Sequence, residues 1–240
     1  MRNMIHHHKP QLLSAGCGAV CAALSLWLLR SKDTQGLYDP GHPAKLLLLI
    51  TGLVAAAALL LSVRGLKDDG RYSKLFPACP IAAAGTLISA LGSFLCVPAG
   101  FTSVRPMGTL CALTGIIAGI ALAFLAWCRL QGRQPGFLIR SCVLVHLCVH
   151  LLCQYQTWIP LPQLADYCFP LLASVCLVMA CYHRTAFDAG LGKLRPYVFF
   201  SLMAVFFCCG AAVFSEDRVF YLTMLCWALT DQPQIYTQGE

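Results

Sequence analysis

A run of polar side chains lies inside one of the apolar segments of this chain. His146, His150 and Gln154 are spaced four residues apart within segment 137–155, so a helix would place them on one face. Polar side chains at this depth usually face protein or a water-filled cavity. Neutral imidazoles in this arrangement can bind a metal or haem, relay protons or line a solute pathway. Asp166, at the start of the next apolar segment, is the acidic candidate for orienting them.

The same stripe has a structural interpretation. Histidines on a buried helix face can hydrogen-bond to neighbouring helices and hold a membrane bundle together. The sequence favours this interpretation, with a solute pathway and a metal or haem site as the alternatives. No cofactor is favoured, and whether the chain binds a metal stays open.

The segments that position these residues have the length and composition of membrane spans. The chain is 58% hydrophobic and 11% charged, and its mean hydropathy is +0.70, outside the usual balance of a soluble domain. A transmembrane helix needs roughly 20 mostly apolar residues. The candidates are 12–29, 46–63, 78–98, 107–128, 137–155, 165–182 and 197–214, with a shorter one at 219–230. We therefore predict an all-α, polytopic transmembrane helix bundle of eight spans, or seven if the last segment is re-entrant or interfacial. It forms a single membrane domain over 1–240 with a short polar tail at 231–240.

The distribution of Lys and Arg predicts the orientation of the bundle. Of the 17 basic residues, twelve fall on the side of the amino terminus and five on the opposite side. Because cytoplasmic loops carry the excess of positive charge, we expect a multi-pass protein of a cell membrane with a cytoplasmic amino terminus. The net charge of +7 then reflects topology and attraction to anionic lipid, and does not indicate a nucleic-acid partner.

Two loops on the predicted cytoplasmic side share a pattern. Arg, Asp and Gly recur with the same offsets, as Arg64, Asp68 and Gly70 and again as Arg184, Asp188 and Gly190. This recurrence predicts a four-plus-four parallel repeat with halves 1–120 and 121–240, related by an axis along the membrane normal. The alternative is that cytoplasmic loops draw these residue types independently. In either case the glycine permits a left-handed turn and the carboxylate can accept backbone N–H groups at a helix start, so the loop is expected to act as a rigid latch.

The first of these loops, 65–71, resembles the Gly/Asp/Gly/Arg loop between helices two and three of the major facilitator transporters, including its predicted cytoplasmic location. Its Asp-to-Gly spacing departs from that family's pattern, and eight predicted spans are not the family's twelve. The resemblance covers fewer than ten residues. It therefore implies an analogous loop and no membership of the family.

A stripe of small residues marks segment 107–128 as a packing helix. Its members are Gly108, Ala112, Gly115, Gly119 and Ala123. Small side chains at this spacing let another helix backbone approach closely. We expect the approaching helix to belong to the same chain, with a partner subunit or a homo-oligomer as the alternative.

The remaining polar residues argue against several enzyme classes. The only glutamates are Glu216 and Glu240, so a membrane metalloprotease would have no placed glutamate as general base. No P-loop or dinucleotide fingerprint is present, and the fifteen cysteines form no Cys-x-x-Cys pair. We therefore do not expect an enzyme. The first hypothesis is a small-solute transporter or permease-like component, and the alternatives are a non-catalytic scaffold or accessory subunit and a His-ligated metal or haem protein. The expected partners are the lipid bilayer and a small-molecule solute.

Overall fold

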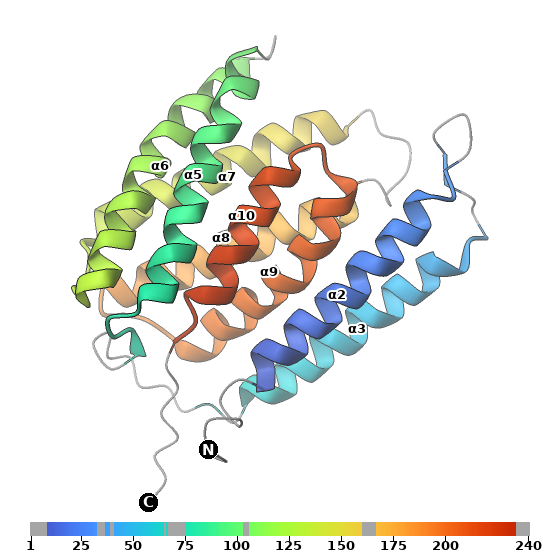
Figure 1. Cartoon of the computed structure of the whole chain (residues 1–240), viewed down its shortest axis with the longest axis horizontal. Helices are drawn as coiled ribbons and strands as arrows, with labels where there is room; N and C mark the ends of the chain where they lie inside the picture. Colours follow the sequence, from blue (N-terminus) through green and yellow to red (C-terminus); the bar gives the residue numbers. More distant parts are fainter. Residues whose placement is uncertain are drawn as a thin grey trace, which may run out of the picture.

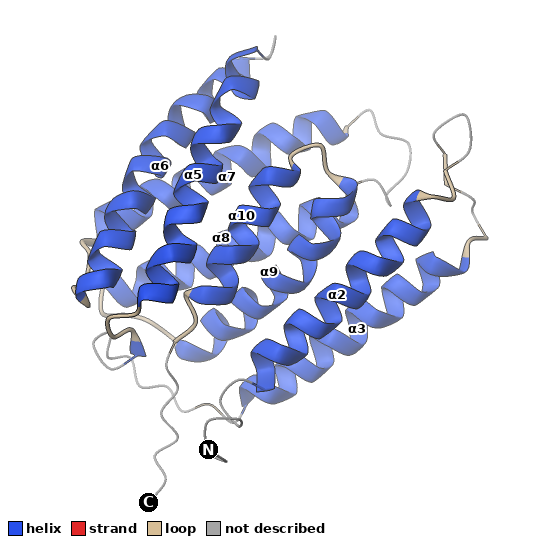
Figure 2. Cartoon of the chain, in the orientation of Figure 1, coloured by secondary structure: helices blue, strands red, loops and turns tan. Residues whose placement is uncertain are grey.

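Eight α-helices account for most of the chain in the computed structural model, which describes residues 9–32, 37–38, 41–64, 66, 75–102, 106–159 and 167–233. The helices are α2 (Lys9–Leu29), α3 (Pro43–Arg64), α5 (Pro80–Thr102), α6 (Pro106–Gln131), α7 (Phe137–Trp158), α8 (Cys168–Asp188), α9 (Leu194–Phe214) and α10 (Arg218–Thr230). Among these described residues there is no strand, only one isolated bridge between Lys32 and Tyr38 (Figure 2). The all-α prediction is confirmed.

Seven of the helices are long and apolar enough to cross a membrane, and α10 is shorter. The protein is therefore a multi-span membrane protein. Three of the long helices begin at a proline, Pro43, Pro80 and Pro106. Proline is well tolerated in the first turn of a helix, because the N–H that it lacks would have no partner there.

The helices alternate in direction, so that α2 begins and α10 ends at the same end of the bundle (Figure 1). We call this the basal end, and the end at which α2 stops the distal end. Helix α9 is central, since α2, α3, α8 and α10 all pack against it. The α2–α3 hairpin covers one side of α9, whereas α5, α6 and α7 lie on the other side of the bundle (Figure 1).

Helix α10 packs against the bundle with one face and is too short to cross a membrane alone. Its 13 residues extend about 20 Å, against a hydrocarbon core of about 30 Å. It packs between α5 and α9 (Figure 1), and its Phe220, Tyr221, Met224 and Trp227 side chains are buried. The segment predicted as 219–230 is thus a short helix that packs on the bundle with one face, and its placement relative to the membrane stays a prediction.

Small residues on α5 allow α10 to approach closely. A Cβ atom added to Gly85 would lie 2.9 Å from the carbonyl oxygen of Cys226, and one added to Gly92 would overlap the Thr223 side chain. Between them, the Ser89 hydroxyl donates to the Thr223 carbonyl oxygen at 2.7 Å. This α5 stripe was not predicted from the sequence, in contrast to the stripe on the neighbouring helix α6.

The predicted stripe on α6 also packs within the chain. A Cβ at Gly119 would lie 2.7 Å from the Phe94 ring of α5, and one at Gly115 would lie 3.3 Å from His146 of α7. Gly108 faces Gly100, whose added Cβ would meet the Gly108 carbonyl oxygen at 2.7 Å and the Ala112 methyl at 2.9 Å. Ala123, the last member of the stripe, packs against the main hydrophobic core.

The two sequence halves differ in how their helices pack. In the second half α8 packs along α9. In the first half the corresponding helices, α3 and α5, lie on opposite sides of α10 and α9 (Figure 1). The four-plus-four repeat therefore stays a prediction from the sequence.

The packing of α10 against α5 makes the first prediction. We expect Gly85→Val to push α10 away, because its Cβ has no room beside the Cys226 carbonyl oxygen. Overpacking of this kind costs about 1–3 kcal/mol, measured as a lower thermal unfolding midpoint in detergent. Gly16→Val is the matched control, since a Cβ at Gly16 has nothing within 4 Å. Equal midpoints for the two variants would contradict the packing of α10 described here.

Candidate functional site

A cavity of about 140 Å³ lies between α5, α6, α7 and the start of α10. We call it the histidine cavity. Its polar lining consists of Ser93, His146, His150, Gln154 and Asp217, and the thiols of Cys96, Cys111 and Cys153 also face it. The structure therefore brings together the three residues of the predicted α7 stripe in one place.

The small-residue helix α6 makes room for this cavity. Gly108, Ala112 and Gly115 form part of its wall, and Gly100 does so from α5. Larger side chains at these positions would fill the space that the imidazoles face. The α6 stripe thus serves both close packing against α5 and the cavity itself.

His146 is held by a neighbouring hydroxyl. Its Nδ1 lies 3.2 Å from the Thr114 Oγ1, and the Thr114 hydroxyl lies 2.9 Å from the Leu110 carbonyl oxygen. Because the hydroxyl has one proton and donates it to that carbonyl, its oxygen is left to accept from Nδ1–H of His146. This bond fixes the ring of His146 against α6.

His150 is buried and has an unused nitrogen. Its ring stacks on Phe220 of α10 at a centroid distance of 3.9 Å, and its Nδ1 lies 3.8 Å from the Cys111 sulfur. Among the described residues its Nε2 has no hydrogen-bond partner. A buried polar atom without a partner costs about 1–3 kcal/mol, so this nitrogen is suited to a water molecule or a polar ligand in the cavity.

The acidic residue beside the stripe is Asp217, which lies immediately before α10. Gln154 donates from Nε2 to its Oδ2. Burial raises the pKa of the Asp217 carboxyl, and the hydrogen bond from Gln154 lowers it by a smaller amount. Asp166, the acidic partner predicted from the sequence, lies outside the described residues. Asp217 was missed because it is 63 positions from Gln154 and only the fold brings it there.

The metal or haem alternative finds no ready ligand set in the part of the chain that the structure describes. No group of three or more His, Cys, Asp or Glu side chains there is arranged to hold a metal ion. The two imidazole centroids are 6.2 Å apart, and each ring has its own protein neighbours. This alternative stays a prediction without support from the geometry.

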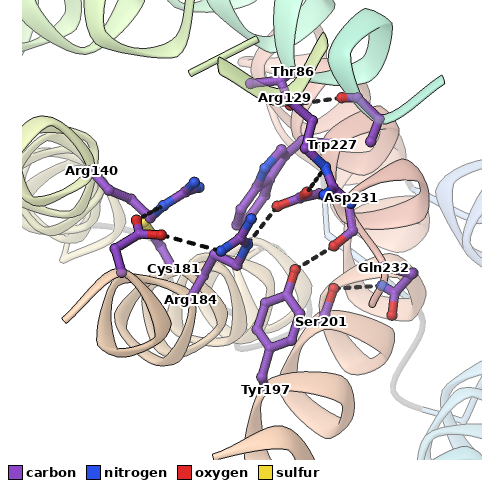
Figure 3. Close-up of polar contacts among 12 residues, drawn as sticks. Thr86, Arg129, Arg140, Cys181, Arg184, Tyr197, Ser201, Trp227, Asp231 and Gln232 are labelled. Atoms are coloured by element: carbon purple, nitrogen blue, oxygen red, sulfur yellow. Dashed lines mark hydrogen bonds and ion pairs between the residues drawn. The ribbon is translucent and has the colours of Figure 1, made fainter. Parts of the chain in front are cut away.

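A second buried polar cluster lies toward the basal end. We call it the arginine network, and it consists of Arg129, Arg140, Arg184, Asp188 and Asp231 (Figure 3). These residues come from α6, α7, α8 and the end of α10, and each is at most 9% exposed. Charges at this burial are tolerated only when they are paired and hydrogen-bonded.

Each arginine of the network has an acidic partner. Arg140 Nε lies 2.5 Å from Asp188 Oδ2, and Arg184 Nη1 lies 3.4 Å from the other oxygen of the same carboxylate. Arg184 Nε lies 2.9 Å and Arg129 Nε 3.3 Å from the carboxylate of Asp231. Two carboxylates therefore serve three guanidinium groups, which leaves one excess positive charge.

Aromatic rings and backbone oxygens complete the network. Arg184 lies over the Phe76 ring at 3.6 Å from its centroid, a cation–π contact that further stabilises the charge. Arg129 donates to the Pro77 carbonyl oxygen at 2.8 Å, and the Tyr197 hydroxyl donates to the Asp231 carbonyl oxygen at 2.5 Å. The network thus joins the chain before α5 to α6, α7, α8, α9 and α10.

Two sequence interpretations are corrected by this network. Arg129, Arg140 and Arg184 were counted as topology charges in and beside loops, but they are buried inside the bundle. Asp231 was assigned to a polar tail, yet it is 3% exposed. Charged residues near a helix end look alike in sequence whether they face water or a buried partner.

The structure describes all three residues of the second predicted loop motif but only one residue of the first. Arg184 and Asp188 form a buried ion pair four residues apart on α8, and Gly190 has a φ of +75°, the left-handed conformation expected of it. In the first loop Arg64 is exposed, whereas Asp68 and Gly70 lie outside the described residues. Gly190 thus adopts the predicted turn, whereas Asp188 binds the side chains of Arg140 and Arg184 and not the backbone N–H groups of a helix start.

Comparisons with known proteins give no assignment. No family model, no curated protein and no solved structure matches the chain. The function must therefore be argued from the geometry of the two clusters.

The second prediction concerns the contribution of the arginine network to the free energy of unfolding. Asp231→Asn leaves Arg129 without a carboxylate and Arg184 with only that of Asp188. Breaking a buried pair costs about 3–5 kcal/mol, measured at neutral pH by thermal or denaturant unfolding in detergent. Glu216→Gln removes an exposed acid from the α9–α10 loop and is expected to change little.

The pH dependence of the same variant gives an internal check. Burial alone would raise the pKa of the Asp231 carboxyl, but the neighbouring Arg184, Arg129 and Arg140 lower it below its ordinary value. A carboxyl with a depressed pKa stabilises the fold above its ordinary pKa and loses that contribution as the pH falls through the folded-state value. The gap between wild type and Asp231→Asn should therefore narrow at acidic pH, and a constant gap would argue against the pairing.

Proposed function

We propose that this protein is a small-solute transporter of a cell membrane and that the histidine cavity is its solute-binding site. The observation that carries the proposal is a partly open cavity with several polar side chains in its wall, beside a buried histidine nitrogen without a partner among the described residues. An apolar cavity of about 150 Å³ can hold a benzene molecule. The histidine cavity, at about 140 Å³, is therefore sized for a solute of a few non-hydrogen atoms.

The lining of the cavity favours a cation. It offers one carboxylate, one amide, one hydroxyl and two imidazoles, and none of its lining residues is Lys or Arg. A small cation with several N–H groups would pair with Asp217 and donate to the unused nitrogen of His150. The substrate class is accordingly a small amine-like or guanidinium-like cation.

The rest of the bundle provides a barrier on one side of this site. Along α7, Arg140 is ten residues from His150, which is about 15 Å of helix. The arginine network therefore closes the basal part of the bundle at a different depth from the cavity. A transport cycle would require this network to separate and reform while the solute stays at the cavity, as in alternating access.

The proposed orientation places the basal end in the cytoplasm. The exposed cations of the basal side include Arg64, Arg133 and Lys193, so positive charge still favours that side after the buried arginines are removed from the count. In this orientation the solute site lies toward the exterior and the ion-paired barrier toward the interior.

A scaffold or accessory role is the second candidate. It is favoured by the hydrogen bond of His146 to Thr114 and by the stacking of His150 on Phe220, because both are the contacts of a packed interior. In this case the cavity would hold only water, and the protein would move no solute.

Uptake of guanidinium into proteoliposomes distinguishes the two candidates and gives the third prediction. Guanidinium is small, permanently charged and rich in N–H donors. We expect uptake above that of protein-free vesicles, reduced about tenfold or more by Asp217→Asn, since a hydrogen bond to a charged group is worth about 1.5–3 kcal/mol. Glu216→Gln, which neutralises the adjacent exposed acid, is the matched control and should transport normally.

The pH profile of uptake provides an independent readout. Because burial raises the pKa of the Asp217 carboxyl, we expect wild-type uptake to fall with decreasing pH before the ordinary aspartate range is reached. Folded wild-type protein that transports no guanidinium at any pH would overturn the proposed substrate class. If a panel of small neutral and anionic solutes is equally excluded, the scaffold role would replace transport.

A further inference from the structure

A second and larger hollow lies on the other side of α9 from the histidine cavity. Its volume is about 660 Å³, and its walls come from α3, α8 and α9 with one contribution from the end of α2. We call it the α3–α8 groove. Apart from Lys45, its lining residues are apolar, small or cysteine, among them Leu48, Leu53, Leu172 and Phe207.

The groove follows from the way the α2–α3 hairpin packs. Both α3 and α8 rest on α9, so α9 forms a floor between them through residues such as Met203 and Phe207. Gly52 has no side chain to occupy the groove, and a Cβ added there would have only the Phe206 ring within 4 Å, at 3.9 Å. The rim residues Leu49 and Leu53 are more than 60% exposed, and on a helix that crosses a membrane such side chains face lipid.

The groove has the depth of one membrane leaflet. Along α3 it extends from Lys45 to Ala56, which is eleven residues or about 16 Å of helix. Half of a hydrocarbon core of about 30 Å is about 15 Å. A single acyl chain entering from the distal membrane surface would therefore be accommodated along the whole groove.

The ammonium group of Lys45 lies at the end of the groove that is expected to face the membrane surface. Lys45 lies in the first turn of α3, and among the described residues it has no acidic partner; its ammonium contacts only the Tyr38 ring, at 6.0 Å from the centroid. The half-exposed Trp27 is in ring contact, at 5.0 Å, with His42, three residues before Lys45. Tryptophan and tyrosine gather at the headgroup level of membranes, which places the ammonium where a lipid phosphate would be.

From this combination we infer that the α3–α8 groove is a binding site for an anionic phospholipid of the distal leaflet. One acyl chain lies along α3 and α9, and the phosphate pairs with the ammonium of Lys45. The inference is independent of the solute site, since the two hollows share no lining residue.

Native mass spectrometry tests the site and gives the fourth prediction. The full chain is reconstituted with equal amounts of phosphatidylglycerol and phosphatidylcholine of matched acyl chains and then released from detergent. We expect one phosphatidylglycerol to be retained in preference to phosphatidylcholine by about fivefold, the effect of about 1 kcal/mol from one lysine near an anionic surface. Lys45→Ala should abolish this preference.

A second variant tests the groove rather than the charge. Gly52→Leu places a side chain in the path of the acyl chain and should reduce retention of both lipids about tenfold or more. Each methylene that is kept out of the groove weakens the binding constant by about fourfold. Gly16→Leu makes the same change at an exposed α2 position with open space around it, and Arg218→Ala removes an exposed cation elsewhere. Neither control is expected to change lipid retention.

Several results would overturn the inference. Equal retention of the two lipids by wild type, or identical retention by Gly52→Leu and Gly16→Leu, would mean that only bulk lipid solvates this face. Displacement of the lipid by soluble glycerol phosphate would show an anion site that needs no acyl chain. A dimer that carries no lipid would show that a second copy of the chain covers the groove.

Discussion

The fold depends on the pairing of charges that the bundle encloses near its basal end. Removing a guanidinium or a carboxylate from water is costly, and the cost is met only when partners are held in place. Arg184 meets this condition by contacting two carboxylates and the face of Phe76. Because its partners come from α8 and the end of α10, the final helix is fixed by electrostatics as well as by packing.

Helix α10 links the two polar clusters of the molecule. Its N-terminal neighbour Asp217 is bound by Gln154 of α7, and its C-terminal neighbour Asp231 is bound by Arg184 of α8. Between them, Phe220 covers the ring of His150 and Trp227 is buried toward the network. The glycines of α5 allow this short helix to pack closely on the bundle, so the contacts of His150 and Gln154 with α10 and Asp217 depend on small residues of a different helix.

The sequence was sufficient for the helices and insufficient for their contacts. Runs of apolar residues identify membrane spans because lipid imposes a length and a composition on them, and the four-residue spacing of His146, His150 and Gln154 placed them correctly on one face. The role of Asp217 and the burial of Arg129, Arg140 and Arg184 depend on neighbours that are distant in the chain. A local pattern cannot distinguish an arginine that faces headgroups from one that faces a buried aspartate.

The placement of the two clusters at different depths supports a transporter more than a uniform packed bundle would. A bundle stabilised only for assembly has no need of a buried imidazole nitrogen at a polar cavity, since apolar side chains in that place would remove the cost of the unpaired atom. The arginine network, in contrast, pairs each of its guanidinium groups with a carboxylate. Along the same short helix, the structure therefore combines an ion-paired end with a polar cavity beside a buried imidazole nitrogen, and this difference is what favours the proposed solute site over packing alone.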